Sequence, residues 1–183
     1  MKFSTIIVFC FCFFSEIGQV RADWPKQAVY LVETEWKYEP VSVPEVEDCN
    51  EKENKLTQSV IGRLKSVQII ARQAKITTDS GQSLDFGKDP GCGFQIPPID
   101  EFILIFESEA TVIFQDTLSE NSEDDNIINL LGLRKNKDGG LVLFFIHTYF
   151  AYTYNEVGQY RYKMCFSTWT TPVREQKTKE KVK

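Results

Sequence analysis

Two long apolar and aromatic runs near the C-terminus restrict the fold most. The first, Leu141 to Tyr154 (LVLFFIHTYFAYTY), is apolar or aromatic on both faces of an extended chain. It therefore predicts a strand that is central in a sheet or lines a cavity. Turn residues at Asn155 to Gly158 lead into Gln159 to Trp169, where aromatic and basic residues alternate. The two runs predict a long β-hairpin. In its second arm, four residues are expected to share the buried face: Tyr160, Tyr162, Met164 and Phe166.

The preceding half of the chain also favours strands. Ala28 to Tyr38 alternates, and Ser59 to Thr77 is rich in β-branched residues, so each predicts a strand, the second bent near Arg72. Phe102 to Phe106 and Ala110 to Phe114 predict an antiparallel hairpin.

Two polar or irregular segments separate these strands. Glu45 to Lys55 is charged, so we expect a solvated loop held by Cys49. Ser80 to Pro98 contains several glycines and prolines and predicts an irregular crossing anchored by Cys92.

A single helix is expected, over 122–135. Ser122 can cap the free amides, and the acidic residues after it complement the positive end of the helix dipole. Ile127, Leu130 and Leu131 form an apolar stripe, and Gly139 can end the segment. The fold prediction is all-β or β-rich: a single antiparallel barrel or sandwich of six to seven strands with this helix packed on it.

The N-terminus has the layout of a secretory signal peptide. A basic start precedes the short apolar run Ile6 to Phe14, and small residues end at Ala22. We therefore expect residues 1–22 to be removed, residues 23–172 to form one secreted, extracellular domain, and residues 173–183 to be a disordered, lysine-rich tail. No later segment predicts a membrane span.

The mature chain keeps three cysteines, Cys49, Cys92 and Cys165. An odd number in an oxidising compartment allows one internal bridge and one spare thiol. Spacing does not determine which pair closes. We predict a Cys49–Cys92 disulfide with Cys165 as the free thiol; a disulfide-linked dimer through the odd cysteine is the alternative.

Composition and motifs argue against several functions. The net charge is −5, which gives no electrostatic footprint for nucleic acid. The chain has one histidine, His147, and neither a nucleophile elbow nor zinc-ligand spacing. We therefore expect no enzyme activity, no catalytic residues, no metal and no cofactor. A second expectation concerns ligands: if the barrel carries a small apolar molecule, its lining would include His147, Tyr149, Tyr152, Tyr162 and Phe166.

One stretch resembles the netrin-like module, the OB-type barrel found in tissue inhibitors of metalloproteinases. Ile76-Thr77-Thr78 leads to Cys92-Gly93 and then to the run Glu101 to Phe106. Those inhibitors bind the catalytic zinc through an N-terminal cysteine, where this chain has Asp23-Trp24-Pro25, and three cysteines cannot form their three disulfides. The resemblance therefore implies the fold without metalloprotease inhibition.

The chain also resembles a lipocalin-like barrel, in its length, its leader and its first strand around Val29 to Val32. It lacks the Gly-x-Trp that opens lipocalins, and its predicted helix precedes the last hairpin. The resulting hypothesis is a secreted, non-enzymatic protein-interaction module on a netrin-like barrel. The alternative is a lipocalin-like extracellular carrier of a small hydrophobic ligand.

Overall fold

A computed structural model describes residues 24–40, 47–88, 95–116, 128–154 and 160–176, and of residues 47, 150–154 and 160–163 it describes only the backbone. The predicted signal peptide (1–22) and the end of the predicted tail lie outside these residues. None of the helices in the described part of the chain is long and apolar enough to cross a membrane.

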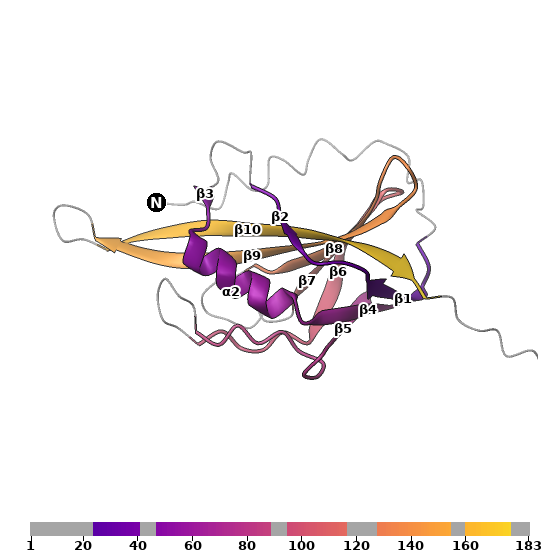
Figure 1. The fold of residues 1–183 in the computed structure, drawn as a ribbon, viewed down its shortest axis with the longest axis horizontal. Coiled ribbons are helices and arrows are strands. Elements are labelled where there is room, and N and C mark those ends of the chain that lie inside the picture. The colour runs from indigo at the N-terminus through magenta and orange to yellow at the C-terminus, as the bar shows by residue number, and fades with distance from the viewer. Residues whose placement is uncertain (1–23, 41–46, 89–94, 117–127, 155–159, 177–183) are drawn as a thin grey trace, which may run out of the picture.

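Eight antiparallel strands close into a barrel (Figure 1). Each strand pairs with the next barrel strand along the chain, and the last pairs back with the first. They are β1 (Gln27–Val32), β4 (Leu64–Ile70), β5 (Gln73–Thr78), β6 (Glu101–Glu107), β7 (Thr111–Asp116), β8 (Leu130–Lys135), β9 (Leu141–Tyr154) and β10 (Tyr160–Glu175). Two short strands, β2 (Lys37–Tyr38) and β3 (Glu47–Asp48), also pair with β10.

The β-rich antiparallel barrel is confirmed, but eight strands close it where six to seven were expected. One reason is that the predicted bent strand over 59–77 is two strands, β4 and β5. The chain reverses between them at Ala71, whose φ of 54° lies in the left-handed region. The predicted bend near Arg72 is therefore a complete turn.

The predicted helix over 122–135 is wrong in its second half. Residues 130–135 form β8, which pairs with β7 on one side and β9 on the other. The hydrogen bonds and buried side chains of a central strand outweigh local helix signals. Residues 117–127, with the proposed cap at Ser122, lie outside the described residues.

Among the described residues, the helix is α2 (Glu51–Ile61), in a segment predicted as a solvated loop and the start of a strand. Its first turn is a capping box. The Asn50 side chain accepts from the amides of Lys52 and Glu53, and the Glu53 carboxylate accepts from the amide of Asn50. In Figure 1, α2 runs alongside the β9–β10 hairpin. Polar Glu53 and Thr57 are buried on this helix, which is why its apolar pattern was weak.

The β9–β10 hairpin is confirmed, but the buried face of β10 is the opposite of the one predicted. Met164 is 39% exposed and Phe166 is half-buried, whereas Cys165, Ser167 and Trp169 are buried. The register explains the difference: Cys165 and Ser167 lie opposite the buried residues Tyr149 and His147 of β9, and directly opposed residues share a face of the sheet. β10 also continues to Glu175, so residues 173–175 belong to a strand and not to the predicted tail.

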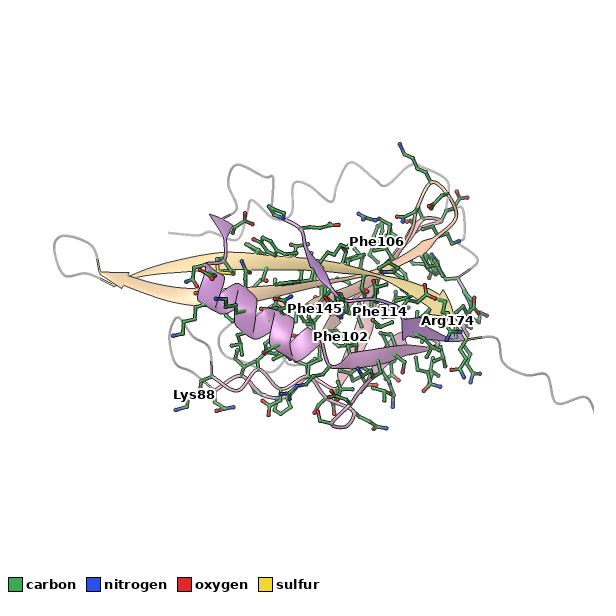
Figure 2. The ribbon with its side chains drawn as sticks, in the orientation of Figure 1. Lys88, Phe102, Phe106, Phe114, Phe145 and Arg174 are labelled. Carbon is green, nitrogen blue, oxygen red and sulfur yellow. A yellow bond between two sulfur atoms is a disulfide. The ribbon has the colours of Figure 1, made fainter. Side chains whose placement is uncertain are left out.

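Aromatic side chains fill the barrel interior. Phe102, Phe114 and Phe145 lie together at its centre (Figure 2), and all three are fully buried. The irregular crossing between β5 and β6 is confirmed in its described parts, which contain only isolated bridges. It contributes buried side chains of its own to the core, namely Leu84, Phe86, Ile96 and Ile99.

Candidate functional site

Two of the residues expected to line a ligand cavity, His147 and Tyr149, pack in the barrel interior instead. His147 stacks on Phe86, with ring centroids 4.0 Å apart, and meets Tyr149 edge-on at 4.3 Å. Both His147 and Tyr149 are fully buried, and Phe166 is half-buried on the other face of β10. The side chains of Tyr152 and Tyr162 lie outside the described residues. At the level of His147, rings in contact therefore occupy the barrel.

A buried chain of polar groups begins at this histidine. His147 Nδ1 bonds to Asn129 Oδ1, and the Asn129 amide donates to Asp116 Oδ2. Because an amide oxygen only accepts, Nδ1 carries the proton. His147 Nε2 then has no hydrogen-bond partner in the described structure. Burial lowers the pKa of His147 to about 3, so the ring is neutral at physiological pH.

Hydrogen bonds join α2 to the β9–β10 hairpin next to these buried polar groups. The Thr57 hydroxyl lies 2.6 Å from the Tyr149 hydroxyl, which donates to the Glu53 carbonyl. Ser167 donates to the Asn54 side chain. The sequence did contain one signal for this helix: Asn50 and Glu53 have the spacing of a capping box.

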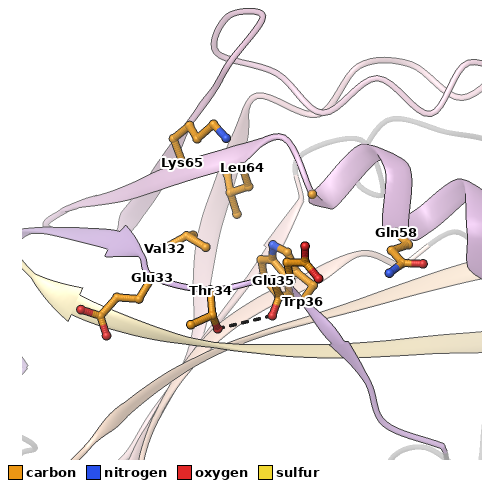
Figure 3. Close-up of a pocket in the computed structure, with 9 residues that line it drawn as sticks. Val32, Glu33, Thr34, Glu35, Trp36, Gln58, Leu64 and Lys65 are labelled. Atoms are coloured by element: carbon orange, nitrogen blue, oxygen red, sulfur yellow. Dashed lines mark hydrogen bonds between the residues drawn. The ribbon is translucent and has the colours of Figure 1, made fainter.

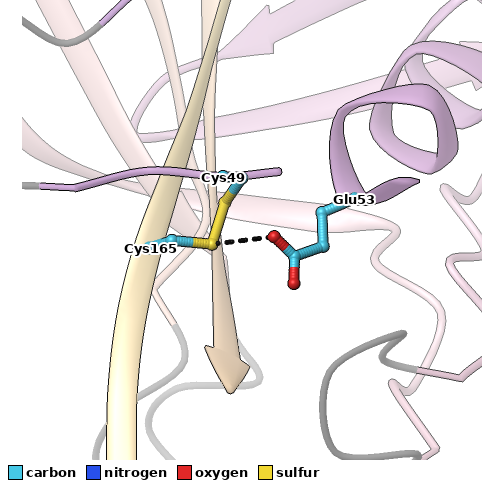
Figure 4. Close-up of side chains that lie close together, drawn as sticks. All are labelled: Cys49, Glu53 and Cys165. Atoms are coloured by element: carbon cyan, nitrogen blue, oxygen red, sulfur yellow. Dashed lines mark hydrogen bonds between the residues drawn. A yellow bond between two sulfur atoms is a disulfide. The ribbon is translucent and has the colours of Figure 1, made fainter. Parts of the chain in front are cut away.

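The disulfide joins Cys49 to Cys165, and its sulfur atoms lie against the buried carboxylate of Glu53 (Figure 4). The predicted Cys49–Cys92 pairing is wrong, and so is the free thiol at Cys165. Cys165 faces inward beneath Cys49 because β3 pairs with β10 at that position. Cys92 lies outside the described residues. Glu53 Oε2 is 3.2 Å from Cys165 Sγ, but a bridged sulfur has no proton to donate. Thiolates and carboxylates can ligate zinc, and the bridge occupies both sulfurs.

A pocket of about 570 Å³ lies outside the barrel interior, between the β1–β2 connection and the end of α2 (Figure 3). Trp36 is 5% exposed and lines this pocket, yet its indole N–H has no hydrogen-bond partner among the described residues. The sequence pattern predicts Trp36 within a strand and available to the core, and it gives no signal for a pocket. We call this feature the Trp36 pocket; its apolar wall is Val32, Trp36 and Leu64.

An open strand edge is the second surface feature. β5 pairs with β6 only from Glu101 to Ile103, and beyond Leu104 the described pairings of β6 are with β7 alone. The register shifts between Leu104 and Phe106, as in a β-bulge. Ile105 is 54% exposed and Phe106 is 44% exposed. We call residues 105–107 the open β6 edge.

The comparisons with known proteins identify no relative. No protein-family model matches the chain, and neither a curated protein nor a solved structure matches it.

Proposed function

We propose that this protein is a secreted, non-enzymatic interaction module on a lipocalin-like barrel, and that its protein partner docks as an extended strand on the open β6 edge. The observation that carries the proposal is an apolar strand edge with one neighbouring strand. The leader-like N-terminus and the Cys49–Cys165 bridge support secretion, because disulfides persist in oxidising compartments.

The strand order supports the lipocalin-like alternative over the netrin-like one. The eight barrel strands follow one another up and down in chain order. Eight-stranded up-and-down barrels are typical of lipocalins, whereas the OB-type barrel of netrin-like modules is a five-stranded Greek key. The helix at 122–135 was the main argument against a lipocalin, and half of that segment is β8.

The packed interior favours a protein partner over a small ligand inside the barrel. An eight-stranded barrel either fills with side chains or holds one small ligand. Here Phe86 of the irregular crossing is buried against β9, with its ring stacked on His147 and near Phe145. Within the described residues, His147 bonds to Asn129 and to no hydroxyl or thiol group, so it does not activate a nucleophile there.

The open β6 edge has the chemistry of a strand-docking site. Backbone N–H and C=O groups on an unpaired edge can accept a further strand, and apolar side chains at that edge add selectivity. Ile105 and Phe106 supply such side chains, and exposed apolar residues of this size at a strand edge are typical of interaction surfaces.

The test compares Phe106→Lys with Met164→Lys. Both positions are exposed apolar residues, but Met164 lies on β10, away from the open β6 edge. The immobilised proteins are incubated with secreted proteins of the source organism, and partners are identified by mass spectrometry. We expect the wild type and Met164→Lys to retain the same partner and Phe106→Lys to lose it. Hydrogen exchange within residues 105–107 should slow in the complex at the amides that face the open edge, because these amides pair with the partner strand.

Two results would reject this function. A partner retained equally by Phe106→Lys does not use the open β6 edge. A complex in which exchange slows elsewhere but not at residues 105–107 binds through another surface.

A further inference from the structure

We infer that the Trp36 pocket binds a small amphiphilic molecule: an apolar body with a hydrogen-bond-accepting head, either a neutral carbonyl or a carboxylate. This inference does not depend on the proposed function, because the Trp36 pocket and the open β6 edge share no residue.

The unpartnered indole N–H is the first argument. Leaving a buried donor without an acceptor is costly, and most buried polar groups in proteins are paired. The other two tryptophans of the chain follow this rule. Trp24 Nε1 donates to the Ser108 carbonyl at 2.7 Å, and Trp169 Nε1 donates to the Ser167 hydroxyl. Among them, Trp36 alone lacks an acceptor within the described structure, and Trp36 lines the pocket.

The size and lining of the pocket are the second argument. A volume of about 570 Å³ lies within the range of about 300–1,000 Å³ that small-molecule sites span. Val32, Trp36 and Leu64 offer an apolar wall, so the body of the ligand should be apolar. Because an indole N–H only donates, the head of the ligand must accept.

The wall between α2 and β4 keeps this pocket open. Gly62 caps α2 and lines the pocket, and a Cβ atom at this position would lie 2.8 Å from the Gln58 carbonyl oxygen. A side chain there would move the helix end or enter the pocket. Three exposed charged residues line the pocket, namely Glu33, Glu35 and Lys65. Arg174 forms an ion pair with Glu33 at 3.4 Å, and Lys65 offsets Glu35, so the charges around the pocket do not select one sign of ligand.

The test uses three probes with the same apolar body: octanamide, octanoate and octylammonium. The first two carry an acceptor, and the third carries donors only. We record the three tryptophan indole N–H signals of the isotope-labelled protein by NMR during titration with each probe. Octanamide, octanoate or both should shift the Trp36 signal and leave the Trp24 signal in place, whereas octylammonium should bind at least several-fold more weakly.

Two variants test the donor with a matched control. Trp36→Phe keeps an aromatic wall and removes the N–H, so binding of the accepting probe should weaken by about two- to tenfold, the effect of one neutral hydrogen bond. Trp24→Phe is the same change at an indole that already has an acceptor, so binding should be unchanged. If Trp36→Phe does not fold, Gln58→Trp gives a second test. It fills the pocket from an exposed helix position and should abolish binding.

Several results would overturn the inference. A Trp36 signal that no probe moves at millimolar concentration would mean that water alone occupies the pocket. Equal binding of octylammonium, or equal affinity of the wild type and Trp36→Phe, would remove the role of the indole donor. Binding that survives Gln58→Trp would place the probe elsewhere. Comparing octanamide with octanoate decides between a neutral and an anionic head.

Discussion

His147 shows how one buried side chain sets a pH dependence. Its folded-state pKa is lowered to about 3 by burial, from an ordinary value of 6.5. Between these values the unfolded chain binds a proton that the folded protein does not, so the free energy of unfolding falls as the pH falls. From about pH 7.5 to about pH 5, the loss due to this group should be about 2 kcal/mol. Urea denaturation at the two pH values measures it.

His147→Gln is the control for this prediction. The chain has one histidine, so its other ionisable groups are present in both proteins and their contributions cancel in the comparison. The variant should lose about 2 kcal/mol less than the wild type over the same pH interval, whatever its stability at neutral pH. An equal loss in both proteins would show that His147 takes up its proton normally in the folded state.

Gly132 on β8 is a second single-residue constraint. It lies opposite Phe144 of β9, and the Phe144 ring covers it: an added Cβ would lie 2.0 Å from Phe144 Cζ. Gly132→Ala must push the ring aside, and we expect a loss of about 1 kcal/mol in the free energy of unfolding, because the ring can swing away from the strand. In a Phe144→Ala background the same change should cost much less. A full cost in that background would contradict steric conflict with the ring.

At the level of elements, period-two patterns were predictable and the helix was not. The continuous apolar run Phe102 to Phe106 and the two arms of the last hairpin predicted strands, and the structure has β6, β9 and β10 there. The buried face of β10 was not predictable in the same way, because it follows from the register with β9. The segment before Lys135 fits a helix as well as a strand until its neighbours β7 and β9 are known. α2 was missed because its buried face includes the polar residues Glu53 and Thr57. The Thr57 hydroxyl bonds to the Glu53 carbonyl and to Tyr149 of β9, and the contact with β9 exists only in the folded protein.

The same limit applies to the candidate sites. His147 and Tyr149 were correctly placed on one face of a strand, but whether that face is hollow depends on Phe86, which arrives from a distant irregular segment. The open β6 edge depends on where β5 begins, and the Trp36 pocket depends on α2. Each of these features depends on contacts between segments that are distant in the sequence, and no residue pattern within one segment indicates them.

The capping box of α2 gives a prediction for this element. Asn50→Ala removes the acceptor for the amides of Lys52 and Glu53, at 3.0 and 3.1 Å, and should lower the free energy of unfolding by about 1 kcal/mol. Asn50→Asp keeps an acceptor and adds a favourable charge at the helix start, so its stability should stay close to that of the wild type. Denaturation of both variants checks this. Equal losses would show that Asn50 does not act as the cap.

For the whole molecule, the disulfide holds the added elements onto the barrel. Cys49 directly precedes α2, and Cys165 lies on β10, 116 residues away in the sequence. The bridge therefore fixes the start of α2 against the hairpin, where the Tyr149 hydroxyl bonds to the Thr57 hydroxyl and donates to the Glu53 carbonyl. Closing so long a loop restricts the unfolded chain strongly.

Removing the bridge should therefore have the largest effect of the changes considered. We expect Cys49→Ala with Cys165→Ala to lower the free energy of unfolding by about 3–5 kcal/mol, measured by denaturation without reductant. Reductant should destabilise the wild type by a similar amount and leave the double variant unaffected. Cys92→Ala is the matched control, since the bridge does not use Cys92, and it should remain sensitive to reductant. Non-reducing peptide mapping that links Cys92 to either partner would contradict the pairing, and with it the account of how α2 is held.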